Sequence, residues 1–236
     1  MDLLKFCLLA SLYSLLAGCN YTGVTGDPVI RNLTWFSYLN GDDIRSSCSP
    51  GAPDRYRLIY NAQWDKQVRT YEITARHPLA SIPTQTGAVL DIRVFVSTGV
   101  INSYIDTLSG RAGGSATSLT LGPVEIAEFR DKLARSGFDQ PLLNSVWLRS
   151  DQFFWIGMAC ENGQFRYKAW PIDPTVPAND LARLAFPAFL MAHDTVKPPA
   201  SPAHYLALSP FDSARAQKEH NSIQFRLEVD ASGIRK

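Results

Sequence analysis

Apolar and polar side chains alternate along several short stretches of the chain, and this pattern predicts a domain built mainly of β-strands. The alternation is regular in Arg55–Tyr60, Val89–Ser97 and Ile223–Val229. It is typical of antiparallel strands that turn one face toward a core and the other toward solvent. The short aromatic run Leu33–Leu39 is interpreted as a further strand.

A hairpin is predicted between Arg55–Tyr60 and a second strand at Gln67–Ile73. With Tyr60 placed opposite Gln67, Arg55 falls opposite Glu72 on the polar face of the pair. Opposite charges in such a cross-strand pair contribute up to about 1 kcal/mol.

The segment Gln152–Pro171 carries the clearest hairpin pattern of the chain. Its centre is Asn162-Gly163, a preferred two-residue type I′ turn. This turn gives the hairpin one wholly apolar face, which includes Cys160 and should point into the core. The opposite face mixes small, basic and indole groups, namely Trp155, Gly157, Arg166, Lys168 and Trp170.

Two helices are expected to interrupt the strands. Pro123–Ser136 begins with a proline, which suits a first helical turn, and is followed by Gly137, which suits a helix end. Asn179–His193 is the second, and Pro187 in its middle is expected to kink or split it. Residues 98–118 contain no long apolar run and are interpreted as a loop.

These elements predict a mainly β or α+β fold. We expect antiparallel sheets arranged as a sandwich or a half-open barrel, with one or two packed helices. Residues 32–236 are expected to form this fold as a single globular domain.

The start of the chain carries a pattern of export. The apolar run from Phe6 to Leu16 is too short for a bilayer span, which needs about 20 apolar residues, but it has the length of a signal-peptide hydrophobic region. The run ends in Leu16, Ala17, Gly18 and Cys19. This tetrapeptide resembles the lipobox of bacterial lipoproteins, with leucine three positions before the cysteine and small residues between them.

The resemblance implies a lipid-anchored protein of the bacterial cell envelope. In that family the chain is cleaved before the cysteine, here Cys19, whose thiol carries a diacylglycerol and whose new amine is usually acylated. Residues 1–18 would then be the signal peptide and residues 19–31 a lipidated tether. Because the next residue is Asn20 and not aspartate, the sorting habit of the family implies the outer membrane, on the side that faces the periplasm.

Two cysteines remain in the mature chain, Cys48 and Cys160. An even pair in an oxidising compartment predicts a Cys48–Cys160 disulfide. Two separate buried thiols are the alternative.

Composition and motifs give no basis for naming a catalytic residue, a metal site or a cofactor. The formal net charge of +1 argues against a nucleic-acid partner. His193 precedes Asp194, but a histidine at a helix end is favoured by the helix dipole, and we prefer that interpretation to a catalytic one. Ser115 follows Gly114, yet position 117 is threonine where a nucleophile elbow requires glycine.

The face with Trp155, Arg166, Lys168 and Trp170 is a possible binding face, because tryptophan and arginine are frequent at binding hot spots. The alternative is that a helix or second sheet covers it. The expected function is non-catalytic binding or scaffolding in the envelope, with another envelope protein or peptidoglycan as the partner. An envelope hydrolase and a carrier of an apolar or lipid ligand are the alternatives.

Overall fold

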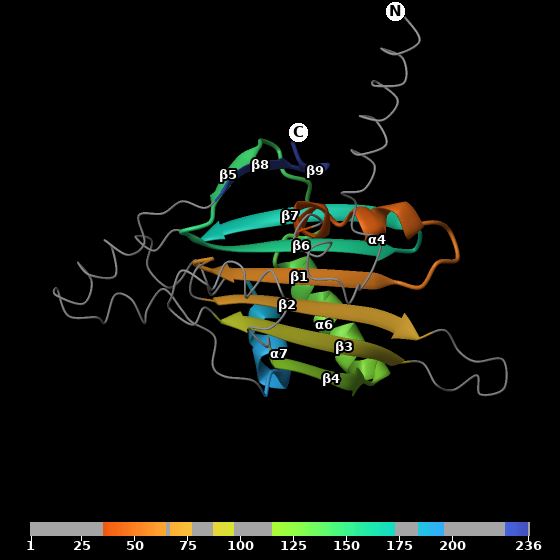
Figure 1. The fold of residues 1–236 in the computed structure, drawn as a ribbon. Coiled ribbons are helices and arrows are strands. Elements are labelled where there is room, and N and C mark those ends of the chain that lie inside the picture. The colour runs from red at the N-terminus through yellow and green to blue at the C-terminus, as the bar shows by residue number, and fades with distance from the viewer. Residues whose placement is uncertain are drawn as a thin grey trace, which may run out of the picture.

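The computed structural model describes residues 35–64, 67–76, 87–96, 115–172, 184–195 and 225–235. Within these ranges the chain forms a six-stranded sheet, a three-stranded sheet and four helices (Figure 1). Every strand pair in both sheets is antiparallel. The predicted antiparallel α+β fold is therefore confirmed.

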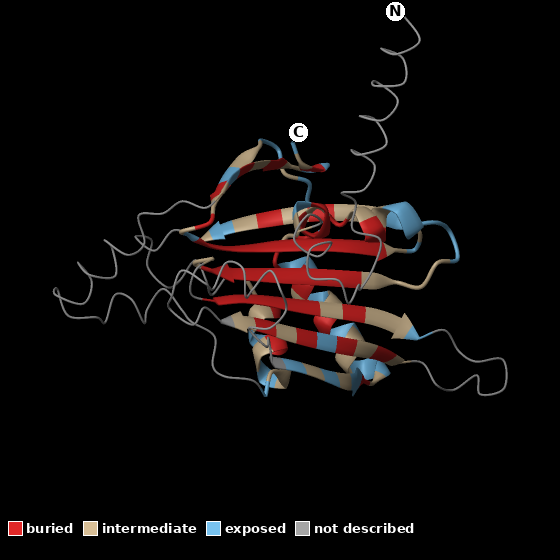
Figure 2. Cartoon of the chain, in the orientation of Figure 1, coloured by how far each residue is buried: buried red, intermediate tan, exposed pale blue. Residues whose placement is uncertain are grey.

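The larger sheet has the strand order β4-β3-β2-β1-β6-β7. Its first four strands form a meander, after which β6 returns to pair with β1 and β7 becomes an edge strand. The central strands β1 and β6 are buried along nearly their whole length (Figure 2). The strands span Arg55–Ala62 (β1), Gln67–Arg76 (β2), Gly87–Val96 (β3), Ser115–Leu121 (β4), Phe153–Glu161 (β6) and Gln164–Ile172 (β7).

The hairpin β6–β7 has the register that a two-residue turn at Asn162-Gly163 imposes, with Cys160 opposite Phe165 and Trp155 opposite Trp170. Asn162 and Gly163 both take positive φ angles, 52° and 74°, as a type I′ turn requires.

The predicted register of β1–β2 is wrong by two residues. Ala62, and not Tyr60, lies opposite Gln67, so Arg57 rather than Arg55 faces Glu72. A shift of two residues keeps every side chain on its predicted face, because the side-chain period of a strand is two.

Helices α6 (Pro123–Arg135) and α7 (Phe186–His193) cover one face of the larger sheet (Figure 1). Phe129 and Phe186 are fully buried against the strands. α6 ends before Gly137, whose φ of 77° suits a helix end, as predicted. The helix expected at Asn179–His193 begins only at Phe186, since Leu184 and Ala185 are not helical, so Pro187 lies in the first turn of α7 rather than in the middle of a helix. Residues 179–183 lie outside the described residues.

The other face is covered by helices and by the smaller sheet, whose order is β5-β8-β9. The helices are α3 (Trp35–Asn40) and α4 (Asp42–Ser47), and the strands are β5 (Val146–Arg149), β8 (Arg226–Asp230) and β9 (Gly233–Ile234). Apolar side chains of β5 and β8 share a cluster with side chains of β6 and β7, so the two sheets pack against each other.

Two further segments, 33–39 and 98–118, differ in part from their predicted structure. The strand expected at Leu33–Leu39 is wrong from Trp35 onward, since α3 begins there; residues 33 and 34 lie outside the described residues. Trp35, Tyr38 and Leu39 are three and four residues apart, and this helical spacing places them together on the core cluster. The loop expected at 98–118 is wrong for 115–118, which pair with β3 as part of β4; residues 97–114 lie outside the described residues.

Candidate functional site

The predicted Trp155/Trp170 face is covered and does not form an open surface. Trp155 is only 1% exposed; it stacks on Tyr60 at a centroid distance of 4.7 Å and meets the edge of Phe186 at 5.1 Å. Trp170 lies 5.0 Å from Phe186 and donates its Nε1–H to the carbonyl oxygen of Ser136 at 2.9 Å. The binding-face prediction is therefore wrong for Trp155, on which α7 packs, while Trp170 remains half-buried beside Phe186 and the end of α6.

The two basic residues of this face tie β7 to the segment that follows α6. Arg166 contacts Asp139 at 2.7 Å and Glu161 at 3.2 Å, and Lys168 donates to the carbonyl oxygen of Gln140 at 2.6 Å. Partial burial lowers the pKa of Lys168. Both basic side chains thus hold residues 139–140, which follow α6, against β7.

We expect Gly157→Ala to destabilise the protein by about 1–3 kcal/mol, the usual cost of overpacking a core. A Cβ at Gly157 would lie 2.8 Å from Trp170 and 3.0 Å from Leu58. On an uncovered strand face the same change would instead be neutral or stabilising. Urea unfolding of the variant measures the sign, and a gain in stability would contradict the covered face.

An open pocket of about 280 Å³ lies between α6 and the ends of β1 and β6. Its lining includes the apolar side chains of Leu133 and Phe138 and a chain of hydrogen bonds around the hydroxyl of Tyr56. That hydroxyl donates to Glu161 at 2.8 Å and accepts from Arg130 at 2.8 Å.

The Tyr56 phenol is held in its neutral form. Burial raises its pKa, and the hydrogen bond to the Glu161 carboxylate acts in the same direction. Arg130 is fixed in turn by Asp54 at 2.6 Å. A neutral phenol between paired charges positions neighbouring groups but supplies no nucleophile. We therefore interpret this cluster as a joint between α6 and the sheet.

The remaining residues with candidate chemistry are His193 and Asp194. His193 contacts the carbonyl oxygen of Phe189 at 2.9 Å and the carboxylate of Glu125 at 3.4 Å. Asp194, although adjacent in sequence, instead pairs with the buried Arg69 and accepts a hydrogen bond from Tyr71. His193 and Asp194 thus serve different contacts. Within the described ranges no cluster of three His, Cys, Asp or Glu side chains could hold a metal ion.

Exposed large apolar side chains gather at the smaller sheet. Among the described residues four are prominent: Trp147 (56% exposed) lies on β5, Leu143 (92%) precedes β5 by three residues, and Phe36 (47%) on α3 contacts Phe225 next to β8. The fourth, Val124 (80% exposed), lies on α6. We call Leu143, Trp147 and Arg226 the docking surface.

Trp147 is fixed by its strand and by Arg226. In β5, Val146 and Leu148 join the apolar cluster between the sheets, so Trp147 points outward. The Arg226 guanidinium lies 5.7 Å from the centre of its indole ring, within the range of a cation–π contact. The alternation in Val146–Arg149 could have revealed this outward tryptophan, but the strand is too short to stand out in the sequence.

The charges around the docking surface are mostly neutralised. Glu228 accepts from Ser145 at 2.6 Å and pairs with Arg235 at 2.9 Å, while Arg149 pairs with Asp151 at 2.6 Å. Arg226 forms no ion pair with another residue in the part of the chain that the structure describes. Its positive charge therefore remains available beside the indole.

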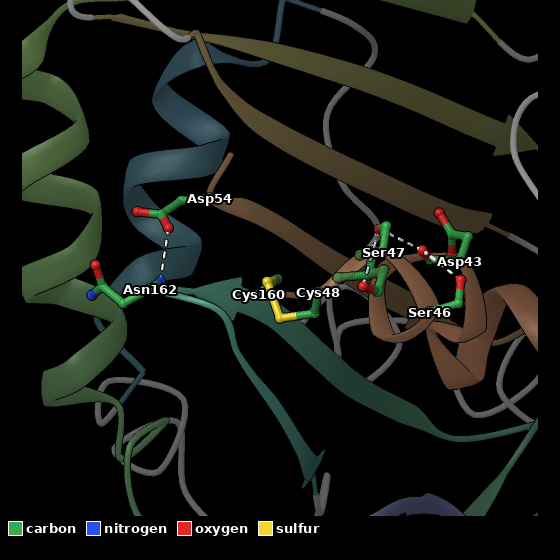
Figure 3. Close-up of a disulfide and its surroundings, with 8 residues drawn as sticks. Asp43, Ser46, Ser47, Cys48, Asp54, Cys160 and Asn162 are labelled. Atoms are coloured by element: carbon green, nitrogen blue, oxygen red, sulfur yellow. Dashed lines mark hydrogen bonds between the residues drawn. A yellow bond between two sulfur atoms is a disulfide. The ribbon is translucent and has the colours of Figure 1, made fainter. Parts of the chain in front are cut away.

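The predicted disulfide is present, and the lipobox lies outside the described residues. Cys48, at the end of α4, is bonded to Cys160 at the end of β6 (Figure 3). Close by, the backbone N–H of Asn162 donates to Asp54 at 2.9 Å (Figure 3).

Leu16, Ala17, Gly18 and Cys19 fall in residues 1–34, which the structure does not describe. Of the helices that it describes, none is long and apolar enough to cross a membrane.

Comparison with models of protein families gives no match to this chain, and comparison with curated proteins and with solved structures gives no significant one. The function is therefore inferred from the lipobox and from the arrangement of the exposed side chains.

Proposed function

We propose that this protein is a lipid-anchored protein of the bacterial cell envelope that works without catalysis, as a binding or scaffold module. The lipobox ending at Cys19 supports an anchor at the periplasmic face of the outer membrane. Two or more acyl chains give stable attachment where a single chain is marginal.

One observation carries the binding role: a half-exposed tryptophan stacked with an arginine on the docking surface. Tryptophan and arginine are the residue types most enriched at binding hot spots. Trp155 has that chemistry too, but it is buried in the core. We therefore assign the docking surface as the site that contacts another component of the envelope.

The anchor is tested by changing the two cysteines of the first 20 residues separately. We expect Cys19→Ser to lose the acyl chains and to move from the detergent phase to the aqueous phase on Triton X-114 partitioning of cells. Cys7→Ser leaves the lipobox intact and should partition as the wild type does. Detergent-phase Cys19→Ser protein without acyl groups would contradict the lipid anchor.

The docking surface is tested by a photoreactive amino acid at position 147 of the full chain in living cells. We expect irradiation to produce a covalent adduct from position 147 and little or none from position 124. Val124 is a matched control because it is exposed and apolar but lies on α6, on the other face of the larger sheet. Adducts from position 124 alone would contradict the binding role.

A further inference from the structure

Arg226, one residue of the docking surface, follows directly on a residue that contacts α3. Trp35 opens α3, the first described element. The Phe36 ring makes an edge contact with Phe225 at 5.7 Å, and Phe225 directly precedes Arg226. At its other end α3 is joined to β9, where Asn40 accepts a hydrogen bond from the backbone N–H of Ile234 at 2.8 Å. α3 therefore runs along the smaller sheet.

We infer that the docking surface rests on the phospholipid bilayer to which the protein is anchored, so that the smaller sheet faces the membrane. This inference rests on the proposed lipid anchor. Cys19 precedes Trp35 by 16 residues. A chain of that length reaches at most roughly 55 Å, so the fold stays near the bilayer and the surface close to α3 is the one held nearest to it.

The side chains of the docking surface match the interface of a bilayer. Tryptophan favours the headgroup level because its ring is apolar and its N–H is polar. Leu143, which is 92% exposed, is free to enter the acyl boundary. Arg226, with no ion pair to a described residue, offers its charge to anionic phosphates beside Trp147.

The lipid anchor makes such a small surface sufficient. A second contact made by a tethered protein is intramolecular, and the effective concentration for a short linker is in the millimolar range. Even a weak contact of one aromatic, one aliphatic and one basic side chain with the bilayer is then formed most of the time. Without the anchor, the same surface would bind vesicles poorly.

The orientation of the protein on the membrane tests the inference. The lipidated full chain with Leu143→Cys is spin-labelled and placed in vesicles of phosphatidylethanolamine and phosphatidylglycerol at 7:3. With Cys19 acylated and the other two cysteines bonded, the new thiol is the one that reacts. We expect the accessibility ratio of oxygen to a water-soluble nickel complex to be several-fold higher at position 143 than at the Val124→Cys control.

The role of charge is tested in the same vesicles. In the labelled Leu143→Cys protein, adding Arg226→Gln should lower the ratio at position 143 by about half, and vesicles of phosphatidylcholine alone should lower it equally without that change. An equal, water-like ratio at positions 143 and 124 would overturn the membrane contact.

Failure of this inference is distinguishable from failure of the proposed function. If position 143 is water-exposed in vesicles while position 147 crosslinks to a protein or a glycan in cells, the binding role holds and the membrane contact is wrong. If Cys19 carries no lipid, the proposed location fails and the membrane contact fails with it.

Discussion

Replacing Cys48 and Cys160 together by serine is expected to lower the free energy of unfolding by about 5 kcal/mol. The two cysteines are 112 positions apart, so the disulfide closes a loop that contains β1 to β4, α6 and β5. In the chain-entropy model, a cross-link across a loop of that size stabilises by about 4.8 kcal/mol. For a domain of this size the melting temperature should fall by roughly 10–20 °C.

The measurement is urea unfolding of the lipidated protein in mild detergent, followed by circular dichroism. Reduction of the wild type should produce the same loss, while Ser47→Ala should not, although Ser47 precedes Cys48 on α4. An unchanged midpoint in the double variant would show that the loops around Cys48 and Cys160 are held by other contacts. One such contact is the close approach of Gly163 to Ser49 and Pro50.

The elements predicted correctly from the sequence are those whose geometry is decided locally. Asn162-Gly163 fixes the register of β6–β7 by turn type alone. α6 is likewise supported within its own turns, by Pro123 at the start and by ion pairs such as Asp131–Arg135 at 2.6 Å. No distant part of the chain is needed to define either element.

The register of β1–β2 was not predictable in this way because it depends on another layer of the fold. Arg57 faces Glu72 and also reaches Asp43 on α4, 14 residues earlier in the chain and outside the sheet. Alternation places Arg57 on a polar face but does not reveal that α3 and α4 cover this face. The sequence pattern therefore predicts solvent where the structure has a buried ion cluster.

The dependence on tertiary packing also explains why the sequence indicated Trp155 as a binding residue and gave little sign of Trp147. Trp155 lies on a central strand that is covered on both sides, and its mixed neighbours Gly157 and Arg166 resemble an open face in the sequence. Trp147 lies on a four-residue strand with little pattern, yet it is the exposed one. Which face is covered is decided by tertiary packing, which a single strand does not encode.

Arg57 lies at the centre of a buried cluster of charged side chains that joins several elements. The Arg57 side chain is fully buried and makes a bidentate contact with Asp43, with both N–O distances at 2.8 Å. Its Nε donates to Glu72 at 3.1 Å, and its guanidinium lies 3.8 Å from the centre of the Tyr38 ring. These contacts join α3 and α4 to the centre of the sheet.

We expect Asp43→Ala to destabilise the protein by about 3–5 kcal/mol, because it leaves a buried guanidinium without its main partner. Asp131→Ala is the matched control. It also removes an aspartate bonded to an arginine, at 2.6 Å, but both side chains of that pair are about 60% exposed. For such an exposed pair on a helix the loss should be only about 0.3–0.5 kcal/mol.

A double variant separates the buried charge from other effects of losing Asp43. Removing one partner of a buried pair is costly, whereas replacing both by apolar groups is often neutral or stabilising. Asp43→Ala combined with Arg57→Met should therefore be more stable than Asp43→Ala alone when urea midpoints are compared. If the second substitution adds to the loss instead, Arg57 stabilises the fold mainly through Glu72 and Tyr38, and the ion pair with Asp43 is not the main contact.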